Sequence, residues 1–142
     1  MPSYDPENIF AKILRGEIPS HKIFEDEHTY AFMDIMPQAD GHALVITKAG
    51  SRNLLDADPS VFAPLMATVQ KVARAAQKAF GVEGVLIKQF NEADAGQTVY
   101  HLHVHVIPRP AGTLLKPHSG KMADHSLLAE HAGKYRAALA EA

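Results

Sequence analysis

Residues 101–107 read His-Leu-His-Val-His-Val-Ile, a strict alternation of imidazole and aliphatic side chains. Successive side chains of a β-strand point to opposite faces, so this pattern predicts a strand with three histidines in a row, about 7 Å apart, on one face. Branched aliphatic residues on the other face favour a strand over a helix. Pro108 follows and lacks the N–H that a further ladder bond needs, so we expect the strand to end there.

His101, His103 and His105 form a candidate functional cluster. One histidine is usually an ordinary polar side chain, but three buried imidazoles cost about 1–3 kcal/mol apiece if they stay unpaired. Two chemistries use such a row. Neutral imidazoles two residues apart on a strand bind zinc and leave one position for a water, as in a metal-dependent hydrolase. Alternatively, one imidazole is a nucleophile that its neighbours orient.

A polar loop precedes the histidine strand. Residues 91–98 lie between the apolar runs 84–90 and 99–107, so they predict the loop of a hairpin. A glycine in this loop lets backbone N–H groups approach a ligand, and the neighbouring amide and hydroxyl side chains offer further donors. Because hydrogen-bond donors suit a phosphate better than a cation, the loop favours the nucleophile over the metal site.

From residue 91 to residue 106 the sequence resembles the signature of the histidine triad family, specifically its Hint-like nucleoside phosphoramidase branch. The resemblance continues through four upstream segments and covers roughly residues 7–110. These segments are residues 9–19, 24–26, 31–39 and 41–46. We therefore expect a single domain that consists of a histidine triad region, 7–110, and a C-terminal tail with a helix, 111–142.

The resemblance implies a role for each histidine. His103 would attack the α-phosphorus of a nucleoside phosphoramidate and give a nucleotidyl-imidazole, which water then cleaves. His101 and His105 would hold the ring of His103 and its phosphate contacts, and His42 matches a further histidine near the triad. A neutral imidazole is a competent nucleophile at neutral pH, and two successive displacements are each easier than one.

The resemblance also implies a site for a purine nucleotide. Asp34 would bind the ribose hydroxyls. The residues expected around the purine are Ile9, Phe10, Ile13, Ile18 and Ile35. The residues expected at the phosphate are Asn91, Gly96, Gln97 and Thr98. The sequence contains no Walker-type glycine loop that would offer another phosphate site.

Some bacterial members of this family carry a structural zinc, held partly by a Cys-x-x-Cys pair and a histidine. The matching positions here are Asn8, Ala11 and Gly50, and the chain has no cysteine. We therefore predict no structural zinc of this kind, no metal ligand among the site residues and no cofactor.

Composition and charge limit the partners. The chain has 142 residues, of which 46% are hydrophobic, and this suits one domain with a sizeable core. Its 14 basic and 16 acidic residues leave a net charge of −2, which argues against nucleic acid or a membrane surface as a partner. Met1 begins no charged and then apolar leader, and no apolar run approaches the roughly 18 residues of a membrane span. We expect a cytoplasmic protein.

The remaining pattern predicts an α+β fold, with about five antiparallel strands and helices on one face of the sheet. Asp5-Pro6 caps a first helix that ends at Gly16, a long helix runs over 62–80, and Asp124 opens a C-terminal helix. The expected strands are 23–25, 29–34, 42–47, 84–90 and 99–107. Three further histidines have no ligand-like spacing and are expected in solvent: His118, His125 and His131.

The resemblance, together with the histidine strand and its loop, implies a purine nucleotide hydrolase or transferase that cleaves nucleoside phosphoramidates through a nucleotidyl-histidine intermediate. The alternatives are a dinucleoside polyphosphate hydrolase, a metal-dependent hydrolase and a noncatalytic nucleotide-binding protein. In the Hint-like branch two subunits pair through the long helix and the strand before the loop, and the C-terminal segments approach the active sites across the dimer. The resemblance therefore implies a homodimer, with a monomer as the alternative.

Overall fold

The computed structural model describes residues 1–117 and 121–141. Its elements follow the chain in the order α1 Ile9–Leu14, β1 Lys22–Glu25, β2 Thr29–Met33, β3 Ala43–Thr47, α2 Phe62–Phe80, β4 Gly84–Lys88, β5 His103–Arg109 and α3 His125–Ala140. Short 3-10 turns occupy Pro59–Val61 and Ala93–Ala95. His118 lies outside the described residues, so its expected exposure to solvent is not described.

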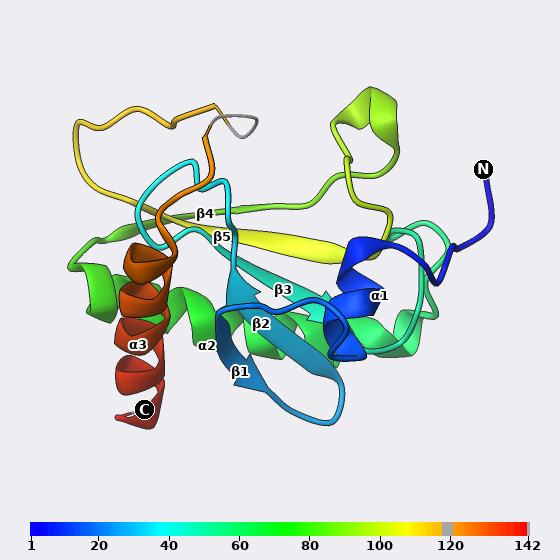
Figure 1. The fold of residues 1–142 in the computed structure, drawn as a ribbon, viewed down its shortest axis with the longest axis horizontal. Coiled ribbons are helices and arrows are strands. Elements are labelled where there is room, and N and C mark those ends of the chain that lie inside the picture. The colour runs from blue at the N-terminus through cyan, green and yellow to red at the C-terminus, as the bar shows by residue number, and fades with distance from the viewer. Residues whose placement is uncertain (118–120, 142) are drawn as a thin grey trace.

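The five strands form one antiparallel sheet in the order β1-β2-β3-β5-β4 (Figure 1). The α+β fold and its five-stranded antiparallel sheet are therefore confirmed. β1 and β4 are the two edges. β5 lies between β3 and β4, so its side chains are flanked by neighbours on both sides. β5 is therefore an inner strand, held on both sides, which suits it to carry a row of functional side chains.

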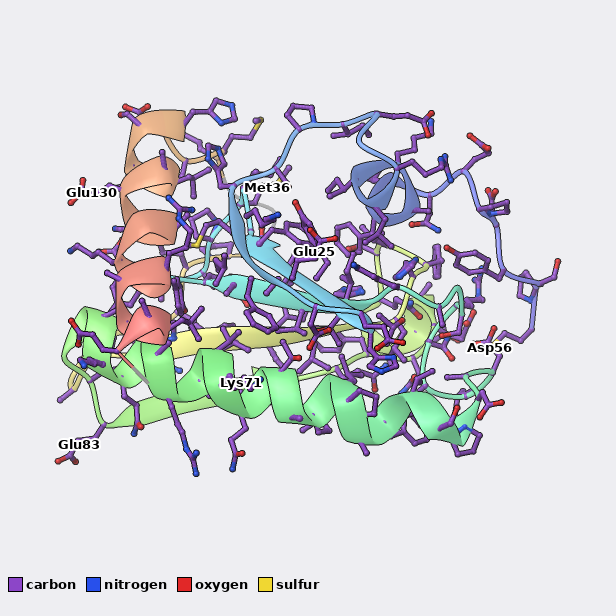
Figure 2. All side chains as sticks on the ribbon, turned by 90° about the horizontal axis from the view of Figure 1, so that it is seen from below. Glu25, Met36, Asp56, Lys71, Glu83 and Glu130 are labelled. Atoms are coloured by element: carbon purple, nitrogen blue, oxygen red, sulfur yellow. The ribbon has the colours of Figure 1, made fainter. Side chains whose placement is uncertain are left out.

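The helices do not all lie on one face, contrary to the expectation from the sequence. Figure 2 shows α2 running under the sheet while α1 lies on the opposite side. Alternate residues of β3 explain this arrangement, because Val45 packs in the core under α2 and α3 whereas Leu44 and Ile46 pack with Phe10 of α1. The sheet is thus covered fully on one face and only partly, by a six-residue helix, on the other.

Local signals set the ends of the helices. α2 ends at Gly81, whose φ of 63° is left-handed and suits glycine. The Asp124 side chain accepts a hydrogen bond from the Ser126 N–H and caps α3, as predicted. α1 is capped by Asn8, which accepts from the Ala11 N–H, and not by Asp5-Pro6, because a side-chain oxygen directly before the first helical residue reaches the open N–H groups.

Two expectations for the histidine strand are wrong. β5 begins at His103, not at residue 99, and it continues through Pro108 to Arg109. Pro108 pairs with Val85 of β4 but lies beyond Val106, the last residue of β5 that pairs with β3. Its missing N–H therefore interrupts no hydrogen bond to β3, and the ladder to β4 continues on the edge side.

α3 packs on the shared core through Leu128, Ala132 and Tyr135, each at most 1% exposed. His131 is 6% exposed and lies edge-on against the ring of Phe80, so its predicted place in solvent is wrong. Its burial lowers the pKa of the imidazole below its ordinary value. Within the described residues, no helix is long and apolar enough to cross a membrane.

Candidate active site

His103 and His105 lie on the same face of β5, with ring centroids 5.1 Å apart, and both line a cavity on the side of the sheet that carries α1. His101 does not continue this row. It lies before the strand begins, it is fully buried, and it is absent from the cavity wall. The alternating pattern therefore places two of the three predicted imidazoles at the cavity and the third behind it.

The ring of His101 is fixed by two hydrogen bonds. Its Nε2 lies 2.6 Å from the carbonyl oxygen of Thr47, and its Nδ1 lies 2.8 Å from the hydroxyl of Tyr4. A carbonyl only accepts, so Nε2 carries a proton and Nδ1 accepts from the tyrosine. Burial lowers the pKa of His101, and the ring is held neutral in this tautomer.

The backbone of His101 orients the next histidine. His103 Nδ1 lies 2.6 Å from the carbonyl oxygen of His101, so the proton of a neutral His103 sits on Nδ1. The lone pair of the ring is then on Nε2. The ring also packs edge-on against Phe10, with centroids 4.9 Å apart, which restricts its rotation. The fold thus fixes which nitrogen of a neutral His103 carries the lone pair.

His105 is oriented by a longer chain of hydrogen bonds. The Gln38 N–H donates to His42 Nδ1 at 3.0 Å, so the proton of His42 is on Nε2. His42 Nε2 lies 2.9 Å from His105 Nδ1 and donates to it, which leaves the proton of His105 on its own Nε2. His42 does not reach the cavity, because it is fully buried behind His105. Its role is therefore to set the tautomer of His105.

The cavity beside the two histidines has a volume of about 570 Å³, within the range of small-molecule sites. Ten residues predicted from the sequence line it: Ile9, Phe10, Ile13, Ile18, Asp34, Ile35, Gly96, Thr98, His103 and His105. Seven others line it that the sequence analysis missed: Pro19, Ser20, Phe32, Met33, Met36, Leu44 and Val99. The wall is mostly aliphatic and aromatic, and its polar groups come from β5, from the loop after β4, and from Ser20 and Asp34.

Pairing between strands explains part of what was missed. Leu44 is the partner of His105 in the β3–β5 ladder, and Phe32 is the partner of Leu44 in the β2–β3 ladder. Directly paired residues share a face of the sheet, so both side chains stand on the face that carries His105. The alternation within each strand shows which of its residues share a face. It shows that Leu44 and Phe32 lie beside His105 only once the order of the strands is known.

The two carboxylate oxygens of Asp34 have different neighbours, one in the backbone and one in a histidine ring. Oδ1 accepts from the Met36 N–H at 2.8 Å, and Oδ2 lies 3.4 Å from His42 Nε2. The side chain is 7% exposed and lines the cavity. Asp34 therefore lies in the cavity wall with one carboxylate oxygen beside His42.

Two residues expected at the phosphate do not reach the cavity. Gln97 is 3% exposed, and its amide bonds the carbonyl oxygens of Arg52 and Val99 and the N–H of Glu92. The Asn91 Oδ1 accepts from the Leu54 N–H at 3.0 Å. Both side chains hold the loop together, because a tight loop has its own buried backbone groups to satisfy. Gly96 and Thr98 are the loop residues at the cavity.

Asp34, His42 and His105 also form a cluster whose ligand atoms lie within 4.8 Å of one another. Two nitrogens bound to one tetrahedral zinc at bond lengths of 2.0–2.1 Å lie about 3.4 Å apart. The 2.9 Å between His42 Nε2 and His105 Nδ1 is shorter and is a hydrogen-bond distance. His42 Nδ1 is occupied by the Gln38 N–H. The observed cluster therefore fits a hydrogen-bonded pair better than a metal centre.

The positions matched to structural zinc ligands have other roles. Asn8 caps α1, Ala11 is buried in that helix, and Gly50 packs against the ring of Tyr4 so closely that a Cβ would lie 2.7 Å from it. None of the three offers a thiolate or an imidazole. A separate cavity of about 720 Å³ lies between β1, α2 and α3, and it contains no predicted site residue.

Two buried histidines of fixed tautomer beside an apolar cavity define a site for chemistry on a small ligand. The HIT domain model matches residues 15–112. A HIT-like protein from Bartonella henselae, described as involved in cell-cycle regulation and crystallised with an unknown ligand, is 54% identical, has a TM-score of 0.93, and is matched over 96% of this chain and 99% of that one. This protein therefore belongs to the HIT family.

Two further relatives bear on chemistry. A zinc-bound histidine triad family protein from Mycobacterium smegmatis is 35% identical, with a TM-score of 0.85, over 95% of this chain and 94% of that one. The adenosine 5'-monophosphoramidase HNT1 of Saccharomyces cerevisiae is 38% identical over 105 residues, which are 74% of this chain and 64% of the yeast protein. The family is thus shown both by sequence and by fold.

Proposed function

We propose that this protein is a nucleotide hydrolase that cleaves the P–N bond of purine nucleoside phosphoramidates through a nucleotidyl-His103 intermediate. The observation that carries the proposal is the 2.6 Å hydrogen bond from His103 Nδ1 to the His101 carbonyl, which assigns the lone pair to Nε2. This nucleophile is already held in one tautomer beside a cavity of about 570 Å³. Little of its freedom therefore remains to be lost when the transition state forms.

In the first step His103 Nε2 attacks the α-phosphorus, and the P–N electron pair leaves with the nitrogen, which takes a proton from the solvent and departs as an amine. The ring is then substituted at Nε2 and protonated at Nδ1, so it carries a positive charge. Its hydrogen bond to the His101 carbonyl becomes charge-assisted at this point and strengthens. An interaction that grows along the reaction lowers the barrier, whereas one of constant strength does not.

The phosphate meets fixed donors in the same region. The Nε2–H of His105 is set by His42, and Gly96 and Thr98 line the cavity next to it. Such donors stabilise the negative charge that gathers on the phosphate oxygens, without any reorganisation at the moment of reaction. In the second step water attacks the phosphorus and gives up a proton to the solvent, His103 leaves as a neutral ring with its lone pair back on Nε2, and the nucleoside monophosphate is released.

The nucleoside end of the cavity favours a flat base. Ile9, Ile13, Ile18 and Ile35 line it with the ring of Phe10, and these are the residues that we assign to the purine. We assign Asp34 to the ribose, because it is the carboxylate in the cavity wall. The activity named for the yeast relative supports the same class of substrate.

The test is turnover of a panel that contains adenosine and guanosine phosphoramidates and dinucleoside polyphosphates, followed by intact-mass analysis after rapid denaturation. We expect the phosphoramidates to turn over fastest and a nucleotidyl adduct to map to His103. Faster turnover of dinucleoside polyphosphates would select that alternative substrate class. Nucleotide binding with no turnover of any substrate would indicate a noncatalytic nucleotide-binding protein.

We also propose a homodimer that pairs through α2 and β4. Both elements expose large apolar side chains, with Met66 of α2 at 50% and Ile87 of β4 at 39%. β4 is an edge of the sheet, and an exposed apolar edge strand offers unpaired backbone groups to a second copy. The sedimentation or light-scattering mass of the purified protein tests this assembly.

A further inference from the structure

Glu92 has a backbone conformation that non-glycine residues rarely adopt. Among the described residues it is the only one other than glycine with a positive φ, at 73°, and its ψ is 161°. This region of φ and ψ is populated almost entirely by glycine, because a Cβ is strained there. Such strain persists only where the surroundings fix the residue in place, and it is found mostly at functional sites.

The Glu92 side chain is fixed by two neighbouring residues of another segment. Its carboxylate accepts from Arg52 Nε at 2.7 Å and from Arg52 Nη2 at 2.9 Å, a bidentate pair. Asn53 Nδ2 donates to the same carboxylate at 2.7 Å. The Arg52 guanidinium in turn lies 3.9 Å from the centroid of the Tyr100 ring. We name Glu92, Arg52 and Asn53 the Glu92 clamp.

The backbone of Glu92 closes the loop that reaches the cavity. The Glu92 N–H donates to Gln97 Oε1 at 2.8 Å, while the Glu92 carbonyl accepts from the N–H groups of Ala95 and Gln97, each at 3.1 Å. Gly96 and Thr98, the loop residues at the cavity, directly flank Gln97. A shift of Glu92 would therefore move both donors that we assign to the phosphate.

We infer that Glu92 is a positioning residue for phosphate recognition, which acts by holding the 92–98 loop through its clamp to Arg52 and Asn53. The inference rests on the proposed function, since it assumes that Gly96 and Thr98 meet a phosphate. Glu92 itself does not line the cavity, so its effect is indirect. Fixed donors stabilise charge better than mobile ones, and the strain is the cost of fixing them.

This role predicts a loss confined to the phosphate end of the ligand. The nucleoside end is built from α1 and residues near Asp34, which the clamp does not contact. Loosening the loop should therefore weaken the binding of a nucleoside monophosphate and leave that of the nucleoside unchanged. A residue that only stabilised the fold would weaken both ligands alike.

Glu92→Gly is the most direct variant, because glycine adopts the observed φ and ψ without strain while the clamp is lost. Calorimetric titrations would compare adenosine with adenosine 5'-monophosphate, and guanosine with guanosine 5'-monophosphate. We expect the ratio of monophosphate to nucleoside affinity to fall by about tenfold, the size of one charge-assisted contact. The melting temperature should fall by no more than about 4 °C, because relief of the backbone strain at residue 92 offsets the loss of the Arg52–Glu92 ion pair.

Glu92→Gln keeps the size of the side chain and removes its charge, so we expect a smaller loss of the same ratio. Glu25→Gln is the matched control. Glu25 lies on the edge strand β1, outside the cavity wall, and the substitution breaks its 2.7 Å ion pair with Lys48. Its affinity ratio should equal that of the unsubstituted protein. If Glu92→Gly fails to fold, Arg52→Lys breaks the bidentate pair without altering residue 92 itself, and we expect it to lower the same affinity ratio.

An unchanged ratio in Glu92→Gly and Glu92→Gln would overturn the inference, as would equal losses for nucleoside and monophosphate. Those results would leave the proposed function standing, because they concern only the loop. If the unsubstituted protein bound neither ligand, the proposed function would fail first. The two ideas are thus separated by the behaviour of the unsubstituted protein.

Discussion

Replacing His103 with alanine separates catalysis from binding. The substitution removes Nε2, the nitrogen that we assign as nucleophile, and it removes the edge-on contact with Phe10. It leaves the His101 carbonyl and the His42–His105 pair in place, because neither depends on the His103 ring for its other hydrogen bonds. The variant therefore keeps the hydrogen bonds that orient the neighbouring histidines and loses the group that we expect to form the covalent bond.

The two expected magnitudes differ widely. A positioned nucleophile has an effective concentration of about 10⁵–10⁸ M, so removing it should lower kcat by at least about 10⁴-fold. Binding loses only the contact of one neutral ring with the ligand, worth about 0.5–1.5 kcal/mol, and the dissociation constant should rise by no more than about tenfold. The gap between a 10⁴-fold and a tenfold effect decides between a chemical and a binding role.

The assay combines steady-state turnover of an adenosine phosphoramidate, calorimetric binding of adenosine 5'-monophosphate, and intact-mass detection of the adduct. His28→Ala is the control, since His28 has an imidazole with 57% of its side chain exposed and lies away from the cavity. Turnover of His103→Ala within tenfold of the unsubstituted protein would refute the nucleophile assignment. A kcat loss matched by an equal loss of binding would refute the division of roles.

Three further outcomes are expected. Purified protein should contain no stoichiometric metal by elemental analysis and keep its turnover in chelator; one tightly held zinc per subunit would revive the metal-dependent reading of Asp34, His42 and His105. Burial lowers the pKa of His131 in the folded protein. Below about pH 6.5 the imidazole of the unfolded state therefore binds a proton before that of the folded state does. The free energy of unfolding then falls by up to about 1.4 kcal/mol for each pH unit, until the folded imidazole also binds its proton. His131→Leu should reduce this slope in thermal melts between pH 7 and about pH 5, although the buried His101 still contributes to it, and an unchanged slope would show that His131 does not contribute. Ile87→Asp on the β4 edge should halve the mass in solution, whereas a protein that is already a monomer would contradict the dimer.

The sequence predicted the parts of the site that depend on local rules. Alternation placed His103 and His105 on one face of β5 and Val104 on the other, because side chains alternate in any strand. Gly81 and Asp124 marked helix ends through their own backbone and side-chain chemistry. Each of these signals is contained within a few residues, so no knowledge of distant contacts was needed.

His101 shows where the local rules stop. The alternating pattern includes it, but the ladder to β3 begins only at His103, which pairs with Ile46. One residue earlier the Leu102 N–H donates to the Ser51 carbonyl instead, and the chain turns out of the strand. This bond joins residues 51 and 102, so a reading of residues 101–107 alone could not find it.

Gln97 illustrates a second limit. An amide next to a glycine in a polar loop is a reasonable phosphate donor, yet here its hydrogen bonds go to the carbonyl groups of Arg52 and Val99 and to the side chain of Asn53. The competing demand comes from Glu92, whose strained conformation has to be held by several partners. Composition shows which donors a loop contains, whereas only the fold shows which of them remain for a ligand.

The tautomers of the site depend on groups that the sequence does not display at all. His103 is set by a carbonyl of the main chain, and His42 is set by the main-chain N–H of Gln38. Every residue except proline carries both a backbone N–H and a carbonyl group. The residue types at positions 38 and 101 therefore do not indicate that these backbone groups bond a histidine. The histidines supply the reactive nitrogens, but the backbone decides which nitrogen of each ring bears the proton. The chemistry therefore follows from how β3 and β5 hold their flanking loops, as much as from the imidazoles themselves.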